Sequence, residues 1–158
     1  MTNNIETTEV QEKKQYIVVK LGSEQYGIDI SYVDNIVRMQ KITRVPKAQP
    51  YFKGIINLRG EIVPVMSIRL KMGFEDDTFT NASRIIILKI EERGTIGVIV
   101  DEVKEVVTLG VGEIDRVTHN TKDIKSTFIN GIGKSLRSIR IWSSKTVVPE
   151  DREWIMAC

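Results

Sequence analysis

The sequence has few of the residues that enzymes use for catalysis or that proteins use to bind metal ions. One histidine, His119, and one cysteine, Cys158, occur in 158 residues. His119 lies in a polar stretch typical of a loop, and Cys158 is the last residue, where a nucleophile would be poorly positioned. A lone cysteine also provides no intrachain disulfide. These shortages argue against a histidine triad, a cysteine nucleophile and a zinc site.

Motifs for phosphate or cation binding are missing as well. There is no Gly-x-Gly-x-x-Gly motif and no Walker loop, and Gly110-Val111-Gly112 indicates only a turn. We interpret Glu75-Asp76-Asp77 as a solvated loop and Asp101-Glu102 as ordinary exposed charges. The sequence therefore predicts a binding protein without catalytic residues, cofactor or metal, rather than an enzyme.

A strong charge of one sign and a long apolar run are also lacking. The 23 basic and 21 acidic side chains leave a net charge of +2, which disfavours nonspecific binding to polyanions. No apolar run approaches the roughly 18 residues of a membrane span, and the polar residues 1–8 do not resemble a secretory signal. We expect a cytoplasmic protein that does not insert into membranes, with a flexible tail over residues 1–13.

The chain does contain many short apolar runs with the two-residue period of β-strands. Residues 22–25 separate two such runs, and further strands are predicted over 54–58, 61–66, 84–90 and 94–100. Ser31 and Asp34 resemble a helix start, and Val33, Ile36 and Val37 have helical spacing, so about two helical turns are predicted there. The chain is otherwise expected to be mostly β.

Two of these runs meet at Asn57-Leu58-Arg59-Gly60. Gly60 tolerates the positive φ of a tight turn, so Arg59 is predicted at an exposed hairpin tip, where its guanidinium offers five donors. Pro64 removes a ladder donor and indicates an edge strand or a bulge. The hairpin is interpreted as an interaction surface; an ordinary surface turn with a solvated arginine is the alternative.

The two halves of the sequence are similar at a shift of 70 residues. Matched positions are Gly27 with Gly97, Val33 with Val103, Ile36 with Val106, and Val37 with Val107. A duplicated β unit predicts two small barrels with a common apolar layer, unless the similarity arises by chance among β-branched strands. The second unit should then supply a closing strand after Gly131. Residues 134–142 offer one plausible short strand, and residues 143–158 are polar.

Several motifs together closely resemble the CheW family of chemotaxis coupling proteins. The matching residues are 21–30, Val33, 42–46, 53–65, 97–103 and 128–133, within about residues 14–133. The resemblance implies an all-β fold of two five-stranded SH3-like barrels that share a hydrophobic core, with short helical segments. It also implies a single domain over residues 14–158, with an atypical segment at 134–158 because the family's usual Leu/Ile-rich closing strand is missing.

The resemblance further implies a noncatalytic adaptor that joins chemoreceptor tips to the regulatory domain of the histidine kinase CheA, in membrane-associated receptor arrays. The family's contact positions correspond to Val33, Gly54, Arg59, Gly60, Ile86 and Gly97. For Val33 a core position, and for the glycines backbone geometry alone, remain alternatives. The family's arginine often lies near a carboxylate just after the Val33 position, where this chain has Asp34-Asn35.

A function of a different class is the alternative. A small β-barrel that binds single-stranded nucleic acid would use the basic residues Lys41, Arg44, Lys47, Lys53 and Arg59. The low net charge and the few aromatic residues available for stacking disfavour this alternative. We therefore predict protein partners and no nucleic acid.

Overall fold

The computed structural model describes residues 13–91, 94–116, 129–133 and 139–142, and over these residues the fold is all-β, as predicted. The first half contains β1 (Lys13–Leu21), β2 (Glu24–Asp29), the 3-10 helix η1 (Ile30–Tyr32), β3 (Val33–Arg38), β4 (Phe52–Leu58), β5 (Glu61–Ser67) and the short helix α2 (Ile68–Lys71). The second half contains β6 (Arg84–Ile90), β7 (Gly94–Val100), β8 (Glu102–Gly110), η2 (Val111–Glu113), β9 (Ile114–Arg116), β10 (Ile129–Gly133) and β11 (Arg140–Trp142).

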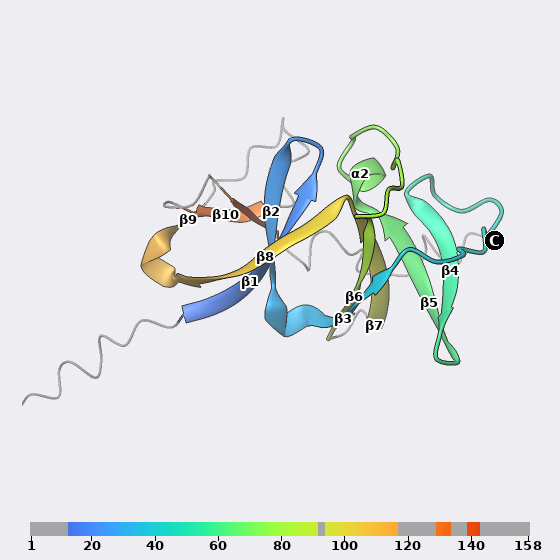
Figure 1. Cartoon of the computed structure of the whole chain (residues 1–158), viewed down its shortest axis with the longest axis horizontal. Coiled ribbons are helices and arrows are strands. Elements are labelled where there is room, and N and C mark those ends of the chain that lie inside the picture. The colour runs from blue at the N-terminus through green and yellow to red at the C-terminus, as the bar shows by residue number, and fades with distance from the viewer. Residues whose placement is uncertain (1–12, 92–93, 117–128, 134–138, 143–158) are drawn as a thin grey trace, which may run out of the picture.

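The strands form two sheets with the same internal order (Figure 1). One sheet runs β8-β1-β2-β11-β10, with β9 added at its end, and the other runs β3-β6-β7-β5-β4. If β1, β2, β3, β4 and β5 are matched with β6, β7, β8, β10 and β11, the two orders are identical. The parallel pairs β2–β11 and β5–β7 also correspond. The duplication predicted from the 70-residue shift is therefore confirmed.

Each sheet takes strands from both halves of the sequence. β3 pairs with β6 of the second half, and the equivalent strand β8 pairs with β1 of the first half. Both pairings contain a bulge at the same place. Asp34 is the extra residue between the pairs that Val33 and Asn35 make with β6, and Lys104 is the extra residue in β8. The bulges lie 70 residues apart, so the repeat extends to the register.

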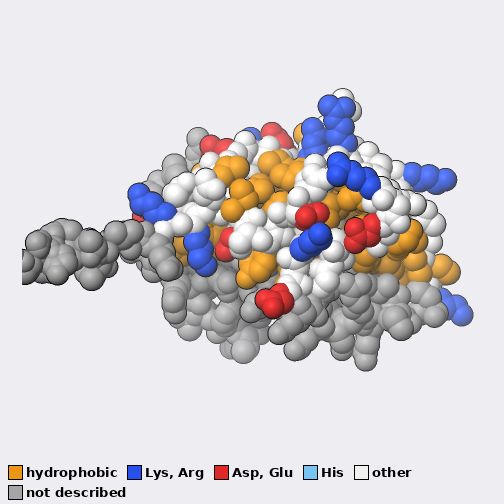
Figure 2. Space-filling model, turned by 90° about the horizontal axis from the view of Figure 1, so that it is seen from below, with side chains coloured by type: hydrophobic (Ala, Val, Ile, Leu, Met, Phe, Trp, Pro, Cys, Tyr) orange, Lys and Arg blue, Asp and Glu red, His pale blue; other side chains and the backbone are white. Residues whose placement is uncertain are grey.

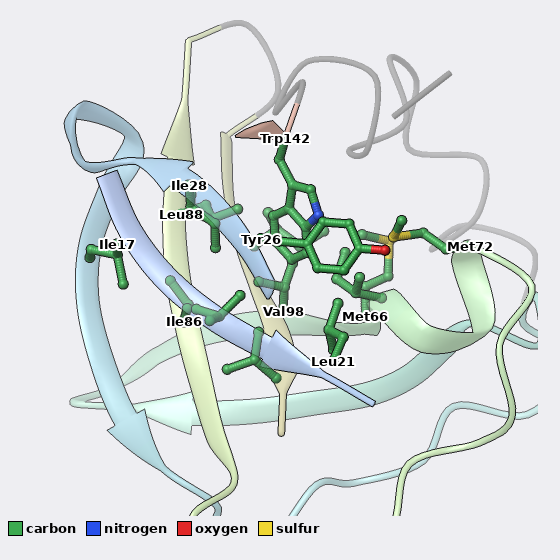
Figure 3. Packing of buried hydrophobic residues seen from close by; sticks show 14 of the residues in the cluster. Ile17, Leu21, Tyr26, Ile28, Met66, Met72, Ile86, Leu88, Val98 and Trp142 are labelled. Atoms are coloured by element: carbon green, nitrogen blue, oxygen red, sulfur yellow. The ribbon is translucent and has the colours of Figure 1, made fainter. Parts of the chain in front are cut away.

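Three apolar clusters fill the described part of the structure. Alternate residues of β1 divide between two of them: Ile17, Val19 and Leu21 face a cluster shared by the two sheets, whereas Tyr16 and Val18 face a cluster within their own sheet. The strand β6 does the same, with Ile86 and Leu88 toward the shared cluster and Ile85 and Ile87 toward the third. Figure 3 shows the shared cluster, in which side chains of β1, β2 and β11 meet those of β5, β6 and β7. The predicted common apolar layer is present.

The short strand expected within residues 134–142 is present as β11. It lies between β10 and β2, the place that β5 occupies in the other sheet. Ile139, Ile141 and Trp142 are buried, and the Trp142 ring lies 5.8 Å from that of Tyr26. β11 has three residues where β5 has seven. Residues 134–138 and 143–158, the rest of the segment predicted to be atypical, lie outside the described residues.

The predicted helix at residues 31–37 is wrong. The chain forms one turn of 3-10 helix, in which the Asp29 side chain accepts a hydrogen bond from the Ser31 backbone, and then continues as β3. The bulge at Asp34 explains the error. By adding one residue, it places Val33 and Ile36 on the same side of the strand, against the shared cluster, and Val37 on the other. A bulged strand therefore reproduces the i, i+3 spacing of a helix.

The interpretation of Asp101 as an ordinary exposed charge is also wrong. Its carboxylate accepts hydrogen bonds from Arg69 Nε at 2.9 Å, from Arg69 Nη2 at 2.5 Å and from the Gly22 backbone at 2.8 Å. The side chains of Arg69 and Asp101 are only 19% and 22% exposed. Because Arg69 follows β5, Gly22 follows β1 and Asp101 connects β7 to β8, this clamp ties the two sheets together.

Replacing Arg69 with alanine is expected to lower the free energy of unfolding by about 2 kcal/mol, because Asp101 keeps one backbone donor but loses both guanidinium donors. Urea denaturation measures the change. Lys14→Ala provides a control, since Lys14 is 58% exposed and lies 3.8 Å from Asp29, and should change the free energy by less than about 0.5 kcal/mol. Equal effects of the two variants would contradict the role of the clamp.

The clamp also gives a pH dependence. Burial alone would raise the pKa of Asp101, but the hydrogen bonds from Arg69 and Gly22 outweigh it and hold the pKa below its ordinary value. The stabilisation is therefore complete above the ordinary aspartate pKa of about 4 and is lost as pH falls through the lower folded-state value. We expect the acid-induced loss of stability to be smaller in Arg69→Ala than in the wild type.

Candidate functional site

The predicted hairpin with Arg59 at its tip is present. Arg59 and Gly60 connect β4 to β5 with φ values of 54° and 85°, the pattern of a type I′ turn. The side-chain oxygen of Asn57 accepts a hydrogen bond from the Gly60 backbone at 2.8 Å, which braces the turn. From the sequence, a positive φ is expected only at Gly60. In the structure Arg59 has a positive φ too, so its exposed side chain extends from within a tight turn.

The reason given for Pro64 needs a correction. β5 is not an edge strand, because it lies between β4 and β7. Pro64 faces Ile55 of β4, and the parallel pairing with β7 begins only at the next residue, Val65. A missing backbone donor is therefore tolerated at this position. The bulge in this hairpin is on the other strand, between Phe52 and Gly54.

Arg59 makes no ion pair with any residue in the described part of the chain. The nearby candidates named from the sequence have other partners: Asp34 lies 3.5 Å from Lys89, and the Asn35 side chain accepts a hydrogen bond from the Ile36 backbone. The guanidinium therefore keeps its five donors for a partner, in an exposed position.

The 3-10 helix η1, which leads into β3, and the β4–β5 turn lie on the same side of the molecule. Val33 begins β3 directly after η1, is partly buried and packs against the shared cluster. Both η1 and the β4–β5 turn lie at the lower side of Figure 1. Figure 2 views that side and shows hydrophobic side chains between basic and acidic ones. We call this side the turn face.

Sequence analysis missed two exposed apolar residues. Ile62, two residues after the turn glycine, is 58% exposed, and Ile30 in η1 is 36% exposed. The exposure of Ile62 could have been predicted from its position. It is the second residue of β5, next to the turn, and the first two residues of this strand are exposed. Isolated exposed apolar residues are common, but these two flank Val33 and Arg59 in sequence.

The other three predicted contact residues are inside the protein. Ile86 is fully buried between β3 and β7. A Cβ on Gly54 would lie 2.1 Å from the Thr43 carbonyl oxygen, and a Cβ on Gly97 would lie 2.8 Å from Ile85 Cγ2. Both glycines are needed where backbone or side chains approach closely. The structure thus brings Val33, Arg59 and Gly60 to the turn face, but not Gly54, Ile86 or Gly97.

The described residues hold no cluster of three or more histidine, cysteine or acidic side chains able to bind a metal ion. Nor does the described part contain a helix of the length and apolar character needed to cross a membrane. Two carboxylates of the acidic run at residues 75–77 make internal contacts: Asp76 pairs with Lys53 at 2.5 Å, and Asp77 accepts a hydrogen bond from the Ser67 hydroxyl at 2.5 Å. The interpretation of this run as solvated was wrong for Asp77, which is partly buried.

Comparisons with known proteins agree with this architecture. A family model described as the CheW-like domain matches residues 15–149. The chemotaxis protein CheW of Bacillus subtilis is 36% identical over 109 residues, which cover 69% of each chain. That of Klebsiella aerogenes is 29% identical over 120 residues, covering 76% of this chain and 72% of the relative. The crystal structure of the scaffolding protein TtCheW from Thermoanaerobacter tengcongensis superposes with a TM-score of 0.75 at 34% identity, covering 84% of this chain and 90% of that one.

Proposed function

Because this chain belongs to the CheW-like family, we propose that it is a noncatalytic chemotaxis adaptor that couples the cytoplasmic tips of chemoreceptors to the histidine kinase CheA. The proposed chemotaxis role rests on the names of the relatives. The proposed scaffolding role rests on the solved structure of a scaffolding protein that this chain resembles. The coupling of these two partners is the finer part of the proposal. Recruitment to receptor arrays at the membrane follows from it, since the adaptor would reach the membrane through the receptors.

The observation that carries the proposal is Arg59 on its braced turn, with no ion pair to any described residue. A guanidinium that has no carboxylate partner among the described residues, held on a rigid hairpin beside the exposed Ile62, suits recognition of a carboxylate or a carbonyl next to an apolar contact. Val33 and Ile30 add apolar surface on the same face. Such a surface binds the exposed stripe of a helical hairpin through apolar anchors and one charged group.

The mechanism would be positional. An adaptor that holds receptor and kinase in one geometry can change kinase output only if its contacts differ between two states of the assembly. Ile86, Gly54 and Gly97, which family resemblance also implicates, would act through the fold: they set the packing of β4, β6 and β7 behind the turn face. Substitutions there would alter binding by deforming this support.

We expect Arg59→Ala to weaken binding of the receptor tip or of the kinase regulatory domain roughly tenfold without lowering thermal stability, because Arg59 is exposed and makes no ion pair within the described residues. Val33→Ser should weaken receptor binding. Calorimetric titration of the purified protein with each partner fragment measures both effects.

Arg38→Ala is the matched control, since Arg38 is an exposed arginine at the other end of β3 from Val33. It should bind like the wild type. If the folded wild-type protein bound neither fragment, the adaptor proposal would be wrong. If Arg38→Ala and Arg59→Ala were equally weak, the turn face would not be the contact surface.

A further inference from the structure

A second surface lies at the opposite end of the hairpin from Arg59 and Gly60. β4 runs from Phe52 to Leu58 before the turn, so about 20 Å separates its two ends. At the Phe52 end there is a groove of about 800 Å³. Its lining comes from the segment between β3 and β4, from the start of β4, and from α2 with the loop that follows, and it includes Met39, Ile42, Arg44, Leu70, Asp76 and Phe79. We call it the distal groove.

The distal groove continues into a smaller hollow of about 360 Å³. The two share Arg44, Pro50, Phe52 and Lys53, and Lys47 lines the smaller one. The two hollows therefore adjoin each other along the chain that leads into β4. Two adjoining hollows suit an extended or helical segment better than a compact small molecule.

Hydrogen bonds hold both walls in place. On one wall, Thr43 and Ile55 exchange two backbone hydrogen bonds, at 2.8 and 2.9 Å, and the Ser67 backbone donates to Tyr51 at 2.7 Å. On the other wall, the Phe74 backbone donates to Arg69 at 2.7 Å, and the Ser67 hydroxyl donates to Asp77. The groove is therefore formed before any partner binds, which reduces the entropy cost of binding.

The floor of the groove is apolar and its rim is basic. Met39, Ile42 and Leu70 provide aliphatic surface, and Phe79 is 51% exposed although it is large and hydrophobic. At the rim, Arg44 and Lys47 are exposed and make no ion pair with the described residues. The acidic residue of the lining, Asp76, is already neutralised by Lys53. Among the described residues, the rim therefore carries positive charge that no carboxylate balances, beside an apolar lining.

We propose that the distal groove binds an acidic amphipathic peptide segment of a partner protein, whose large apolar side chains contact the floor and whose carboxylates pair with Arg44 and Lys47. Single-stranded nucleic acid fits less well. It would use aromatic platforms for stacking, whereas this floor is largely aliphatic. The inference goes beyond the adaptor function and does not depend on it, because the turn face lies at the other end of the hairpin.

The occupant can be identified by selection from a phage-displayed library of random 12-residue peptides on the immobilised full-length protein. Phages that also bind the variant Arg44→Glu/Phe79→Ser are removed first. Both substituted side chains are exposed, and thermal melting of the variant should match the wild type. We expect the enriched peptides to combine Asp or Glu with Leu, Ile, Phe or Trp.

Fluorescence anisotropy with the most enriched peptide then tests the contacts. Arg44→Glu should weaken its binding roughly tenfold, because an attraction becomes a repulsion. Arg59→Glu makes the same charge change on the turn face and should leave peptide affinity within about twofold. This variant also separates the two proposals, since it should impair receptor or kinase binding but not peptide binding.

Three results would overturn the inference. The selection could yield no peptide that distinguishes the wild type from the groove variant. The enriched peptides could be neutral or basic. A 12-nucleotide thymidine oligomer could bind the groove more tightly than the selected peptide, in which case the basic rim serves nucleic acid.

Discussion

Replacing Trp142 with alanine is expected to lower the free energy of unfolding by roughly 3–5 kcal/mol, among the largest effects available in this fold. Trp142 is 2% exposed and belongs to the cluster shared by the two sheets, where it lies against Tyr26 (Figure 3). Removing the indole leaves a cavity at the place where β11 joins β2. In a domain of this size the melting temperature should fall by about 10 °C, as measured by circular dichroism.

Two variants control for this prediction. Phe79→Ala also removes a large aromatic side chain, but from a position that is 51% exposed, and should cost less than about 1 kcal/mol. Trp142→Phe keeps most of the apolar volume and removes the indole N–H, which is buried with no hydrogen-bond partner among the described residues. Its cost should also stay near 1 kcal/mol. If Trp142→Ala melted like the wild type, β11 would not close the sheet in solution.

Replacing Gly54 with alanine is expected to destabilise the protein by about 3 kcal/mol, because two costs add at this position. The new methyl group would lie 2.1 Å from the Thr43 carbonyl oxygen, so backbone must move, and the φ of 141° is unfavourable for any residue with a Cβ. The contact expected to break is the pair of backbone hydrogen bonds between Thr43 and Ile55. Urea denaturation measures the total cost, and amide exchange at Ile55 reports the local one.

Gly60→Ala separates the two costs. Gly60 also has a positive φ, 85°, but a Cβ there would meet nothing within 4 Å. Its substitution should cost only about 1 kcal/mol of backbone strain. If both variants lost receptor or kinase binding, but Gly54→Ala lost about 3 kcal/mol of stability and Gly60→Ala only about 1 kcal/mol, the turn would be a contact and Gly54 a support. Equal destabilisation by the two would refute the close approach at Thr43.

Strands with continuous apolar or alternating runs were predictable from sequence. The runs at 54–58, 61–66, 84–90 and 94–100 each lie within a strand, because runs rich in β-branched residues favour extended backbone. β3 was not predictable in this way. Its bulge reverses which face of the strand the following side chains lie on. Its partner strand β6 begins 46 residues after β3 ends. Nonlocal pairing outweighed the local helix signal.

The candidate site shows a similar division. Arg59 and Gly60 were predictable, because turn chemistry is local. The burial of Ile86, Gly54 and Gly97 was not, because it depends on which strands flank each one. The Arg69–Asp101 clamp was missed for the same reason: its two charges are 32 residues apart in sequence, and no pattern connects them.

The exchange of β3 and β8 between the two halves has a consequence for how the protein is made. When the ribosome has completed the first half, β3 still has no neighbour and β1 lacks one of its two, since their partners β6 and β8 have not been synthesised. The sheet that contains β1 becomes complete only when Trp142 has emerged. Folding should therefore be largely post-translational and slow, as expected for a chain dominated by distant contacts. A nascent chain arrested near residue 75 should be sensitive to protease throughout.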